Sequence, residues 1–216
     1  RLWERVGREP SSSAFNSLIQ LESEHGVPRN PFINAGALVV TDVILSELEE
    51  AAQSVLDFVR LASGVADIDF DDAVAESEAR TGYRNVALAN FIRSFGNLKN
   101  DPTDVLAAYF KHCSISMSCE ELTRAFMFLA RNGTNLTGIK LLSAERTKYI
   151  NALLLTCGTY DAVGDFAYRI GLPTKSGVGG GLVAVMPREF VVCVWSPGLD
   201  EKGNSLVGGQ ALDLLT

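Results

Sequence analysis

Apolar residues recur at helical spacing through the middle of the chain, over residues 36–142. The first repeat places one face of a helix at Ala37, Val40, Ile44 and Leu48. A second helix candidate covers residues 52–62, and residues 85–95 repeat apolar side chains at the same period. Side chains three and four positions apart share one face of an α-helix, so this spacing indicates helices instead of strands. The middle of the chain is therefore predicted to form an all-helical subdomain.

Start and stop signals mark the ends of several of these helices. Residues 69–80 are acidic at their front, which the positive end of the helix dipole favours. Asp101-Pro102 combines an N-cap with proline at the first helical position, and it opens a helix over residues 103–112. The capping-box pattern over residues 118–121 opens a very apolar helix that is predicted to end at Asn132-Gly133.

The first 35 residues follow no such period. Turn-forming residues are frequent there, at Gly7, Pro10, Gly26, Pro28 and Pro31. Apolar side chains are embedded among them, at Phe15, Leu18, Ile19, Phe32 and Ile33. Residues 1–35 are therefore predicted to be an ordered, irregular segment, part of an α/β domain and its connection to the helical subdomain.

The period changes near the C-terminus. A helix candidate over residues 143–156 is followed by two continuous apolar runs, residues 182–186 and 190–195. Continuous apolar runs of this length are typical of strands covered on both faces, so they predict a buried β-hairpin. Residues 205–215 form a last helix candidate that would cover one face of the hairpin. Residues 143–216 are therefore predicted to be the C-terminal part of the α/β domain, and the fold class is α/β with an all-helical subdomain.

Composition narrows the functions that this chain can have. The formal charge of −7 and the lack of any Lys/Arg run argue against nucleic-acid binding, because phosphates require clustered cations. No apolar run reaches about 18 residues and no signal peptide is present, so neither a membrane span nor export is predicted.

The cysteines and histidines point to no metal chemistry. The chain has 4 cysteines and 2 histidines without a C-x-x-C pair, so no metal site and no cofactor is predicted. Cys157 and Cys193 lie in apolar sequence and are predicted to be small, buried hydrophobic residues. This use of cysteine favours a reducing cytoplasm.

Glycine gathers in the stretch from residue 157 to residue 181, on both sides of Tyr160 and Lys175. Glycine lets other backbone or a ligand approach closely, so we expect the chemistry here. Residues 177–181 are no match for the nucleotide-binding pattern G-x-G-x-x-G, because position 182 is leucine and a strand follows instead of a helix. A close-packed entry into the strand is the simpler interpretation.

Lys175-Ser176-Gly177 is a variant of the K-T-G strand that lines the site of β-lactamases and penicillin-binding proteins, opposite a serine in S-x-x-K. That class also places a helical block between two α/β portions. A three-residue match is weak, and a surface lysine in a turn is the alternative. The printed sequence contains neither S-x-x-K nor G-x-S-x-G.

Longer motifs occur in order along the chain: Asn30-Pro-Phe-Ile-Asn-Ala-Gly-Ala37, Ser77-Glu78 through Arg84-Asn85, Thr156-Cys-Gly-Thr-Tyr160-Asp161, Lys175-Ser-Gly-Val-Gly-Gly-Gly181, Trp195-Ser-Pro-Gly-Leu-Asp200 and Gly203-Asn-Ser205. Together they resemble the glutaminase family. These are serine-dependent enzymes of β-lactamase/transpeptidase-like fold that hydrolyse L-glutamine to L-glutamate and ammonia. The resemblance runs from Gly7 to the C-terminus and departs at Pro10-Ser11-Ser12-Ser13, where the family usually has glycine after Pro-Ser.

The resemblance implies a substrate-binding role for several matched residues. Glu78 would pair with the α-ammonium group by a charge-assisted hydrogen bond. Asn34 and Asn85 would donate amide hydrogens to the α-carboxylate, and Tyr109 would reach the substrate through its hydroxyl. Gly82 is expected to break the helix and re-aim Asn85. Without the resemblance, these residues are better explained as a solvated acid, two turn-forming asparagines and a half-buried aromatic.

The resemblance also assigns the chemistry. Tyr160 would contact the substrate and relay the proton from the nucleophile to the leaving ammonia. The backbone N–H of Val178 would form half of an oxyanion hole, and Lys175 would add positive potential or brace the strand. A serine would attack the carboxamide carbon, ammonia would leave, and water would hydrolyse the glutamyl-enzyme.

The family's nucleophilic serine and its lysine, in S-x-x-K, and a further active-site tyrosine would lie before residue 1. The sequence also opens on Arg1 without an initiator methionine. Residues 1–216 are therefore expected to be the C-terminal part of a longer protein, inactive by themselves. Related enzymes are usually oligomeric, which implies a homo-oligomer, dimer or tetramer, in the cytoplasm.

Two alternatives stay open at this point. Another serine amidase or penicillin-recognising hydrolase of the same fold would acylate with β-lactams, although one acid and two asparagines suit a zwitterionic amino acid better. A catalytically incomplete fragment would bind glutamate or glutamine without turnover.

Overall fold

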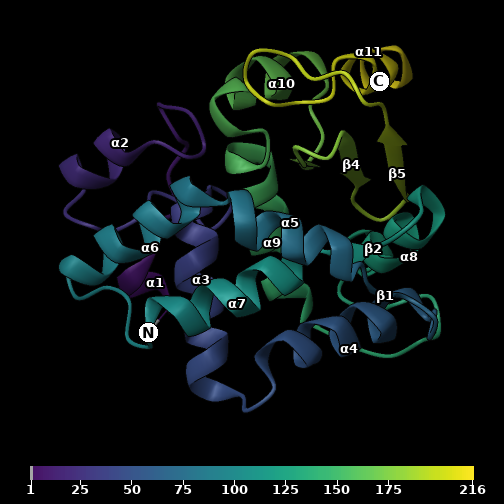
Figure 1. Cartoon of the computed structure of the whole chain (residues 1–216). Coiled ribbons are helices and arrows are strands. Elements are labelled where there is room, and N and C mark those ends of the chain that lie inside the picture. The colour runs from purple at the N-terminus through teal and green to yellow at the C-terminus, as the bar shows by residue number, and fades with distance from the viewer. Residues whose placement is uncertain (1) are drawn as a thin grey trace. The chain divides into compact units, whose positions relative to one another are not determined.

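The computed structural model describes residues 2–216, and over these residues it mixes helices with two small antiparallel sheets (Figure 1). The predicted α/β class is therefore confirmed. Contacts divide the chain into two compact units. Unit 1 holds the residues up to 58 and residues 68–116, and unit 2 holds residues 59–67 and 117–216. Helix α4 (Ala51–Ser63) contributes to both units.

These units have other boundaries than the predicted subdomains. Residues 2–35 pack within unit 1, and α8 (Cys119–Ala130) packs on the sheet of unit 2. The division into residues 1–35, 36–142 and 143–216 stays a prediction about the domains of the complete fold.

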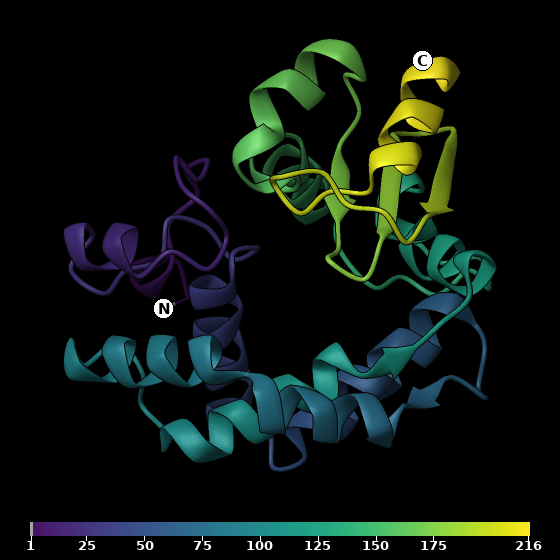
Figure 2. The ribbon, with the colours of Figure 1, turned by 45° about the horizontal axis from the view of Figure 1, so that its top comes forward.

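Unit 1 consists mainly of helices packed around one apolar core. Its helices are α1 (Leu2–Arg5), α2 (Leu18–Ser23), α3 (Asn34–Glu47), α5 (Asp72–Thr81), α6 (Tyr83–Ser94) and α7 (Pro102–Cys113). Helix α7 packs against α3, α5 and α6, and α6 lies beside it in both ribbon views (Figures 1 and 2). Leu38, Leu88 and Val105, which come from three of these helices, are fully buried in the shared core. Two short strands, β1 (Asp69–Phe70) and β2 (Ile115–Ser116), pair antiparallel.

Residues 2–35 are ordered, as predicted, but they are not wholly irregular. They contain α1 and α2, which are 4 and 6 residues long. Helices this short show too little of a 3.6-residue period to be recognised from apolar spacing. Ser17 caps α2 by accepting a hydrogen bond from the Gln20 N–H. Between the helices, the Gly7 N–H donates to the Pro28 carbonyl at 2.8 Å and ties the segment to itself.

Unit 2 is a three-stranded sheet with helices on both faces. Its strands are β3 (Thr174–Ser176), β4 (Gly181–Met186) and β5 (Phe190–Trp195), in the order β3-β4-β5. Its helices are α8, α9 (Ala144–Cys157), α10 (Val163–Arg169) and α11 (Leu206–Leu215), with a 3₁₀ turn at Tyr160–Ala162. Leu182 and Ala184 pack with α10 and α11 on one face, and α8 packs against β4 and β5. Figure 2 shows α11 beside the hairpin.

The predicted hairpin and the last helix are confirmed, with one correction. Strand β4 is buried on both faces, whereas β5 is an edge strand and is only partly covered. Trp195 at its end is 60% exposed. A continuous apolar run alone does not show whether a strand is central or at the edge, because that depends on which strands pair.

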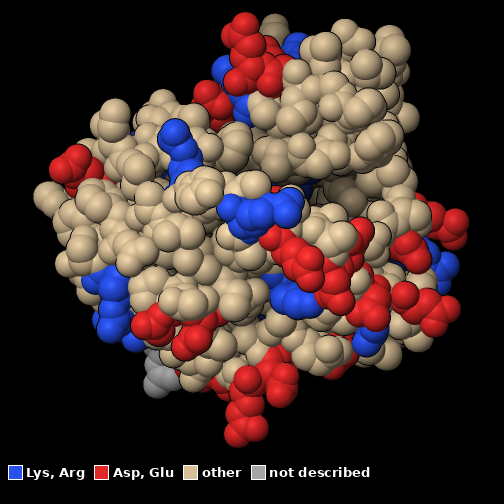
Figure 3. All heavy atoms as spheres, in the orientation of Figure 1, with Lys and Arg blue, Asp and Glu red and all other residues tan. Residues whose placement is uncertain are grey.

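The predicted helix signals behave as expected. Asp101 caps α7 through the Thr103 N–H, with Pro102 at the first helical position. Ser118 and Glu121 form the capping box of α8. Acidic side chains gather over α5, whose front carries Asp71 and Asp72 (Figure 3). None of the helices in residues 2–216 combines the length and the apolarity that a membrane span requires.

Helix α3 buries a different face from the one that apolar spacing indicates. Leu38, Val39 and Asp42 are fully buried, whereas Leu48 lies beyond the end of the helix and is exposed. The predicted face at residues 37, 40 and 44 is only partly covered. Apolar spacing indicated the wrong face because a charged residue, Asp42, occupies a core position of this helix.

The Asp42 carboxylate is buried inside a set of donors. The backbone N–H groups of Lys99 and Asn100 donate to it at 3.0 and 2.8 Å, and the Asn100 side-chain amide adds a further bond at 2.8 Å. The Arg5 guanidinium pairs with the same carboxylate and also donates to the Asn97 carbonyl. Burial by itself would raise the pKa of Asp42, but these donors outweigh it and hold the pKa below 3.8. The carboxylate thereby joins α1, α3 and the loop between α6 and α7.

Replacing Asp42 with asparagine should destabilise unit 1, because the Arg5 guanidinium would then be left without its anionic partner. We expect the free energy of unfolding at pH 7 to fall by roughly 3 kcal/mol. Because the pKa of Asp42 is lower in the folded state, its contribution is present above pH 3.8 and is lost as the pH falls through the folded-state pKa. The gap between native and variant protein should therefore shrink below pH 3.8.

Urea unfolding curves at a series of pH values measure this difference. Asp72→Asn is the matched control, because its ion pair with Lys111 is exposed and should contribute nothing measurable. An Asp42→Asn protein as stable as the native one at pH 7 would show that the buried pair does not hold the unit together.

Candidate functional site

Two of the predicted residues of unit 1, Asn34 and Asn85, are bonded to each other. The Asn34 amide nitrogen donates to the Asn85 amide oxygen at 2.9 Å. Asn34 is the first residue of α3, and Asn85 lies in the first turn of α6. The bond uses one of the two Asn34 amide hydrogens and none of the Asn85 ones, so amide hydrogens remain on both residues. Helix N-termini carry partial positive charge, so this pair sits where two helices favour an anion.

The other two residues predicted in unit 1, Glu78 and Tyr109, lie beside one thiol. Partial burial and the negative charge of Glu78 raise the pKa of Cys113 to about 11, and a hydrogen bond with Tyr109 acts in the opposite direction. Glu78 is half-buried on α5, and Tyr109 packs with one side against the core on α7. Tyr109 therefore has the half-buried position expected of a core aromatic as well as a hydroxyl that reaches Cys113.

The predicted break between Glu78 and Asn85 is present. Helix α5 ends at Thr81 and α6 begins at Tyr83, with Gly82 between them. The Gly82 N–H donates to the Glu78 carbonyl at 2.8 Å, which closes the last turn of α5. Asn85 consequently belongs to a new helix and does not continue the face of α5 that carries Glu78.

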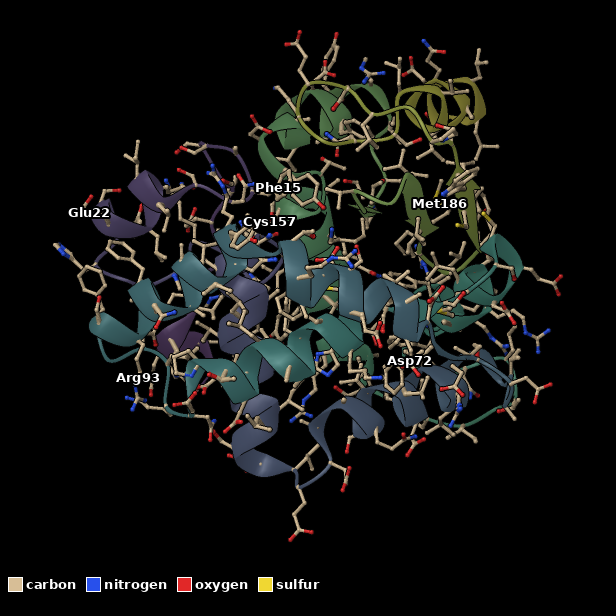
Figure 4. All side chains as sticks on the ribbon, viewed as in Figure 1. Phe15, Glu22, Asp72, Arg93, Cys157 and Met186 are labelled. Atoms are coloured by element: carbon tan, nitrogen blue, oxygen red, sulfur yellow. The ribbon has the colours of Figure 1, made fainter. Side chains whose placement is uncertain are left out.

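In unit 2, the end of α9 approaches the start of the sheet very closely. Cys157 marks the end of α9 in Figure 4, and Gly158 follows it. The Ser176 N–H of β3 donates to the Gly158 carbonyl at 3.0 Å. A Cβ atom on residue 158 would lie 1.8 Å from the Thr174 carbonyl oxygen, so only glycine permits this contact. The chain then turns at Tyr160 with β3 beside it.

Tyr160 is buried and held from two directions. Its hydroxyl donates to the Ser176 carbonyl at 3.2 Å, and the Lys175 ammonium lies 4.7 Å from the centre of its ring. The Lys175 ammonium also donates to the Ser176 carbonyl. Tyr160 adopts a left-handed backbone conformation, with φ of 57°, which is uncommon for a residue other than glycine and costs on the order of 1 kcal/mol. Such strain is retained where the surrounding contacts fix it.

Lys175 lies in strand β3, where the K-T-G-like motif was predicted to place it. Burial of its ammonium group lowers the pKa of Lys175 to about 8. Its side chain is therefore neither a freely solvated surface lysine nor part of a turn. The position fits both predicted roles, positive potential beside Tyr160 and support of the strand.

Val178 lies in the turn that joins β3 to β4. The Gly180 N–H closes this turn on the Gly177 carbonyl at 2.9 Å. The Val178 side chain is 52% exposed, and no hydrogen bond to its N–H is present within residues 2–216. A donor in this state is what an oxyanion hole requires, because the N–H is preorganised and not already used.

The turn is held in place by the end of β5. The Ser196 N–H donates to the Gly180 carbonyl, and the Trp195 indole N–H donates to the Gly179 carbonyl at 2.8 Å. A Cβ on residue 180 would lie 2.1 Å from the Ser196 carbonyl oxygen, and its φ is 96°, so glycine is required here as well. The sequence indicated Trp195 only as part of a family motif. Its indole N–H meets the Gly179 carbonyl only once β4 and β5 pair, so the sequence alone gave no sign of this bond.

Two buried hydroxyl groups beside Tyr160 were also missed. The side-chain oxygens of Thr159 and Ser176 are buried and have no hydrogen-bond partner within the part of the chain that the structure describes. Buried hydroxyls normally find a partner, so these two are polar groups available to a ligand or to water. Their positions next to Tyr160 and Lys175 in the sequence were the only signal that could have identified them.

The predicted residues thus form groups within each unit. Unit 1 contains the bonded Asn34–Asn85 pair, and Glu78 and Tyr109, which both act on Cys113. In unit 2, Tyr160 is bonded to Ser176, which comes two residues before Val178 in the sequence. That they act on one substrate stays a prediction. No group of three or more His, Cys, Asp or Glu side chains able to hold a metal ion occurs in the residues that the structure describes.

Comparison with known proteins gives a consistent result. The family model described as Glutaminase matches residues 1–216. A protein named Glutaminase from Paraburkholderia phytofirmans is 56% identical over 216 residues, which cover 100% of this chain and 71% of that protein. A protein of the same name from Streptomyces coelicolor is 57% identical over 215 residues, and 70% of it is covered.

Solved structures agree with the sequence relatives. A Bacillus subtilis protein described as a probable glutaminase has a TM-score of 0.93 at 32% identity, with 99% of this chain and 72% of that chain covered. A Bacillus glutaminase crystallised in the presence of 4.3 M NaCl has a TM-score of 0.93 at 33% identity, with 99% and 74% covered. The fold is therefore that of the glutaminases, and the predicted β-lactamase-like class is confirmed.

The contact at Gly158 can be tested by adding one methyl group. Gly158→Ala should force the end of α9 away from β3, because its Cβ would overlap the Thr174 carbonyl. We expect the free energy of unfolding to fall by roughly 1–3 kcal/mol, and the Ser176 amide to exchange its hydrogen faster. Thermal unfolding and amide hydrogen exchange measure the two effects.

Gly164→Ala is the matched control, because residue 164 lies in α10 with no atom within 4 Å of the added methyl group. It should leave stability unchanged or raise it slightly, since alanine favours a helix. Equal effects of the two substitutions would rule out a special role for the contact at residue 158.

Proposed function

This chain belongs to the glutaminase family, and we propose that its unit 1 residues bind the amino-acid end of L-glutamine while its unit 2 residues act on the carboxamide. Glutaminases are amidohydrolases, so the products are L-glutamate and ammonia. The observation that carries the proposal is the bonded pair Asn34–Asn85 at the N-termini of two helices. One solved relative, 32% identical with a TM-score of 0.90, is described as Mglu in its glutamate form.

The asparagine pair suits an α-carboxylate. Each asparagine keeps amide hydrogens that their mutual bond does not use, and a carboxylate has two oxygens to accept them. The first turns of α3 and α6 add the partial positive charge of their backbone N–H groups. Neutral donors of this kind bind an anion without adding a further positive charge to the site.

Glu78 suits the α-ammonium group. Its side chain is half-buried, and its negative charge acts on Cys113 at the end of α7, a helix that packs against α5. A carboxylate that meets an ammonium forms a charge-assisted hydrogen bond, which is about twice as strong as a neutral one. Tyr109 lies beside the same thiol and would add a neutral hydroxyl that orients the substrate.

Unit 2 would supply the groups that act during the reaction. The Val178 N–H would stabilise the negative charge that develops on the carboxamide oxygen. The Tyr160 hydroxyl would pass a proton to the leaving nitrogen, so that ammonia and not an amide anion departs. The nearby Lys175 ammonium, whose pKa burial lowers to about 8, would favour the phenolate form of Tyr160 while the proton moves. Water then hydrolyses the acyl-enzyme and releases glutamate.

The nucleophile in this proposal is the family's serine in S-x-x-K, a pattern that residues 1–216 do not contain. The family match favours this reaction over a penicillin-recognising hydrolase, because the relatives are named glutaminase. It also favours an enzyme over a protein that only binds glutamate. The mechanism needs no cofactor.

The remaining parts of the proposal concern assembly and location. We propose a homo-oligomer, because α11 leaves apolar side chains exposed at Leu206, Val207, Leu214 and Leu215. Exposed apolar faces of this kind commonly mark contacts with another chain. A cytoplasmic location is supported by the 4 free cysteines, which a reducing compartment preserves.

The roles of Glu78 and Tyr160 can be separated by kinetics. The variants are made in a protein that contains residues 1–216 and is as long as the related glutaminases. There, Glu78→Gln should raise KM roughly ten- to a hundredfold, because the α-ammonium group of the substrate loses its ionic partner. Tyr160→Phe should lower kcat by roughly 10²–10⁴, because the proton relay is lost while binding remains. Ammonia release from L-glutamine measures both.

Matched controls lie near both residues, one on the helix of Glu78 and one on the helix that follows Tyr160. Glu76→Gln changes an exposed acid on α5, and Tyr168→Phe changes a tyrosine on α10 that is 90% exposed. Both should leave KM and kcat at their native values. A Glu78→Gln, Tyr160→Phe double variant with full activity would contradict the assigned roles.

The 216-residue chain by itself should release no ammonia from L-glutamine, because it contains no serine with a lysine three positions later. A sample whose intact mass matches residues 1–216 should be assayed for ammonia, with the longer protein as the positive control. Calorimetry on the same sample then shows whether it binds L-glutamate. Turnover by the verified 216-residue chain would place the nucleophile within it and overturn this part of the proposal.

A further inference from the structure

Two cysteines from different elements line one cavity in unit 2. Cys119 is the first residue of α8, and Cys193 lies in the middle of β5. Helix α8 packs directly against β5, so the backbone brings the two thiols together. The cavity has a volume of about 280 Å³, and its other lining residues are Met117, Ser118, Leu122, Gly181 and Trp195.

The two thiols differ in their exposure to solvent. Cys119 is exposed, whereas Cys193 is only partly covered and was wrongly predicted to be a buried hydrophobic residue. The correction follows from the cavity that Cys193 lines on β5, a strand that pairs on one side only, so that packing does not enclose this side chain. A dissolved oxidant therefore reaches Cys119 first.

The two side chains also interact directly. Cys193 is hydrogen-bonded to Cys119, and burial, this bond and the charge of a Cys119 thiolate together raise the pKa of Cys193 to about 12. Cys193 is thus protonated at neutral pH while Cys119 is in its reduced state. Once Cys119 is oxidised, it is no longer a thiol that interacts with Cys193 in this way, so these causes of the raised pKa of Cys193 change.

We propose that Cys119 and Cys193 form an oxidation site that closes to a reversible disulfide when the protein meets a peroxide. The evidence is the shared cavity, the direct contact between the thiols and the contrast in their exposure. A water molecule occupies about 30 Å³ in the liquid, so a cavity of this size admits a molecule as small as hydrogen peroxide.

The chemistry proceeds in two steps. The Cys119 thiolate attacks one peroxide oxygen, the O–O bond breaks, and the sulfur becomes a sulfenic acid while the other oxygen leaves as hydroxide. Cys193 gives its proton to that hydroxide, which becomes water. Its sulfur then attacks the Cys119 sulfur, the S–S bond forms, and the sulfenic oxygen leaves and takes up a proton as water. In total, two thiols lose two electrons and peroxide is reduced to water.

Trp195 provides a second way to detect a change at Cys193, through its fluorescence. It lies two residues after Cys193, on the same side of β5, and it lines the same cavity. Its indole N–H holds the Gly179 carbonyl in the turn that carries Val178. A new bond at Cys193 should therefore change the fluorescence of Trp195.

The test is a map of the thiols after exposure to hydrogen peroxide. The 216-residue chain is treated, the peroxide is removed, and free thiols are alkylated in urea before digestion and mass spectrometry without reductant. We expect the Cys119 and Cys193 peptides to lose alkylation together and to appear as one linked pair, lighter by two hydrogen atoms. Dithiothreitol should restore both thiols and the original Trp195 fluorescence.

Variants keep the test decisive. Cys113→Ser should form the linked pair normally, because residue 113 lies in unit 1 and does not line the cavity. In Cys193→Ser, Cys119 should stop at the sulfenic acid and be trapped by dimedone, and the fluorescence change should be absent. Cys119→Ser changes an exposed side chain, so it should fold and should leave Cys193 open to alkylation after peroxide.

The opposite results would overturn the proposal. One is a sample in which peroxide oxidises the exposed Cys113 while Cys119 and Cys193 both remain free thiols. Another is oxidation of Cys119 to the sulfinic acid in the native chain with Cys193 unchanged. Neither readout depends on glutaminase activity, so failure here leaves the proposed function intact.

Discussion

A charged side chain buried in unit 1 sets how its helices can pack. Asp42 has no exposed surface, and an unpaired carboxylate in that position would unfold a domain of ordinary stability. The chain meets this constraint by bringing Arg5, Lys99 and Asn100 to the same point, two of them with backbone N–H groups. Those residues lie before α3 and after α6, so the ends of α1 and α6 are fixed relative to α3. The positions of the N-termini of α3 and α6, which carry Asn34 and Asn85, therefore depend on the bonds to Asp42.

In unit 2, the constraint concerns the backbone N–H of Val178, which is held rigidly without taking part in a hydrogen bond within the described residues. The turn of residues 177–180 is bonded at both ends, to β4 within the hairpin and to the end of β5 through Ser196 and Trp195. The Val178 N–H remains unused in its middle. Because an oxyanion hole works by preorganisation, the stiffness of the turn matters more than any side chain on it. Glycine at position 180 is what lets the two strands close around the turn.

The division of residues between the units matches the two ends of the proposed substrate. Unit 1 offers an acid and neutral amide donors, which suit the paired charges of an amino acid. Unit 2 offers a strained tyrosine, a lysine whose pKa is lowered to about 8 and a free N–H, which suit charge and protons that move during a reaction. The left-handed backbone of Tyr160 belongs to this second set, since strain is tolerated where the surroundings fix one conformation.

The sequence by itself determined the elements whose signals are local. The caps at Asp101 and Ser118, the break at Gly82 and the apolar runs of the hairpin depend on residues within a few positions of each other, and they appear in the structure where expected. The family motifs likewise gave the candidate site residues and the glutaminase assignment. Tertiary structure decided everything that needs a distant partner: the buried face of α3, the edge position of β5, the Trp195 bond and the pairing of Cys119 with Cys193. No spacing along the chain encodes these contacts, because each exists only after strands pair or helices pack.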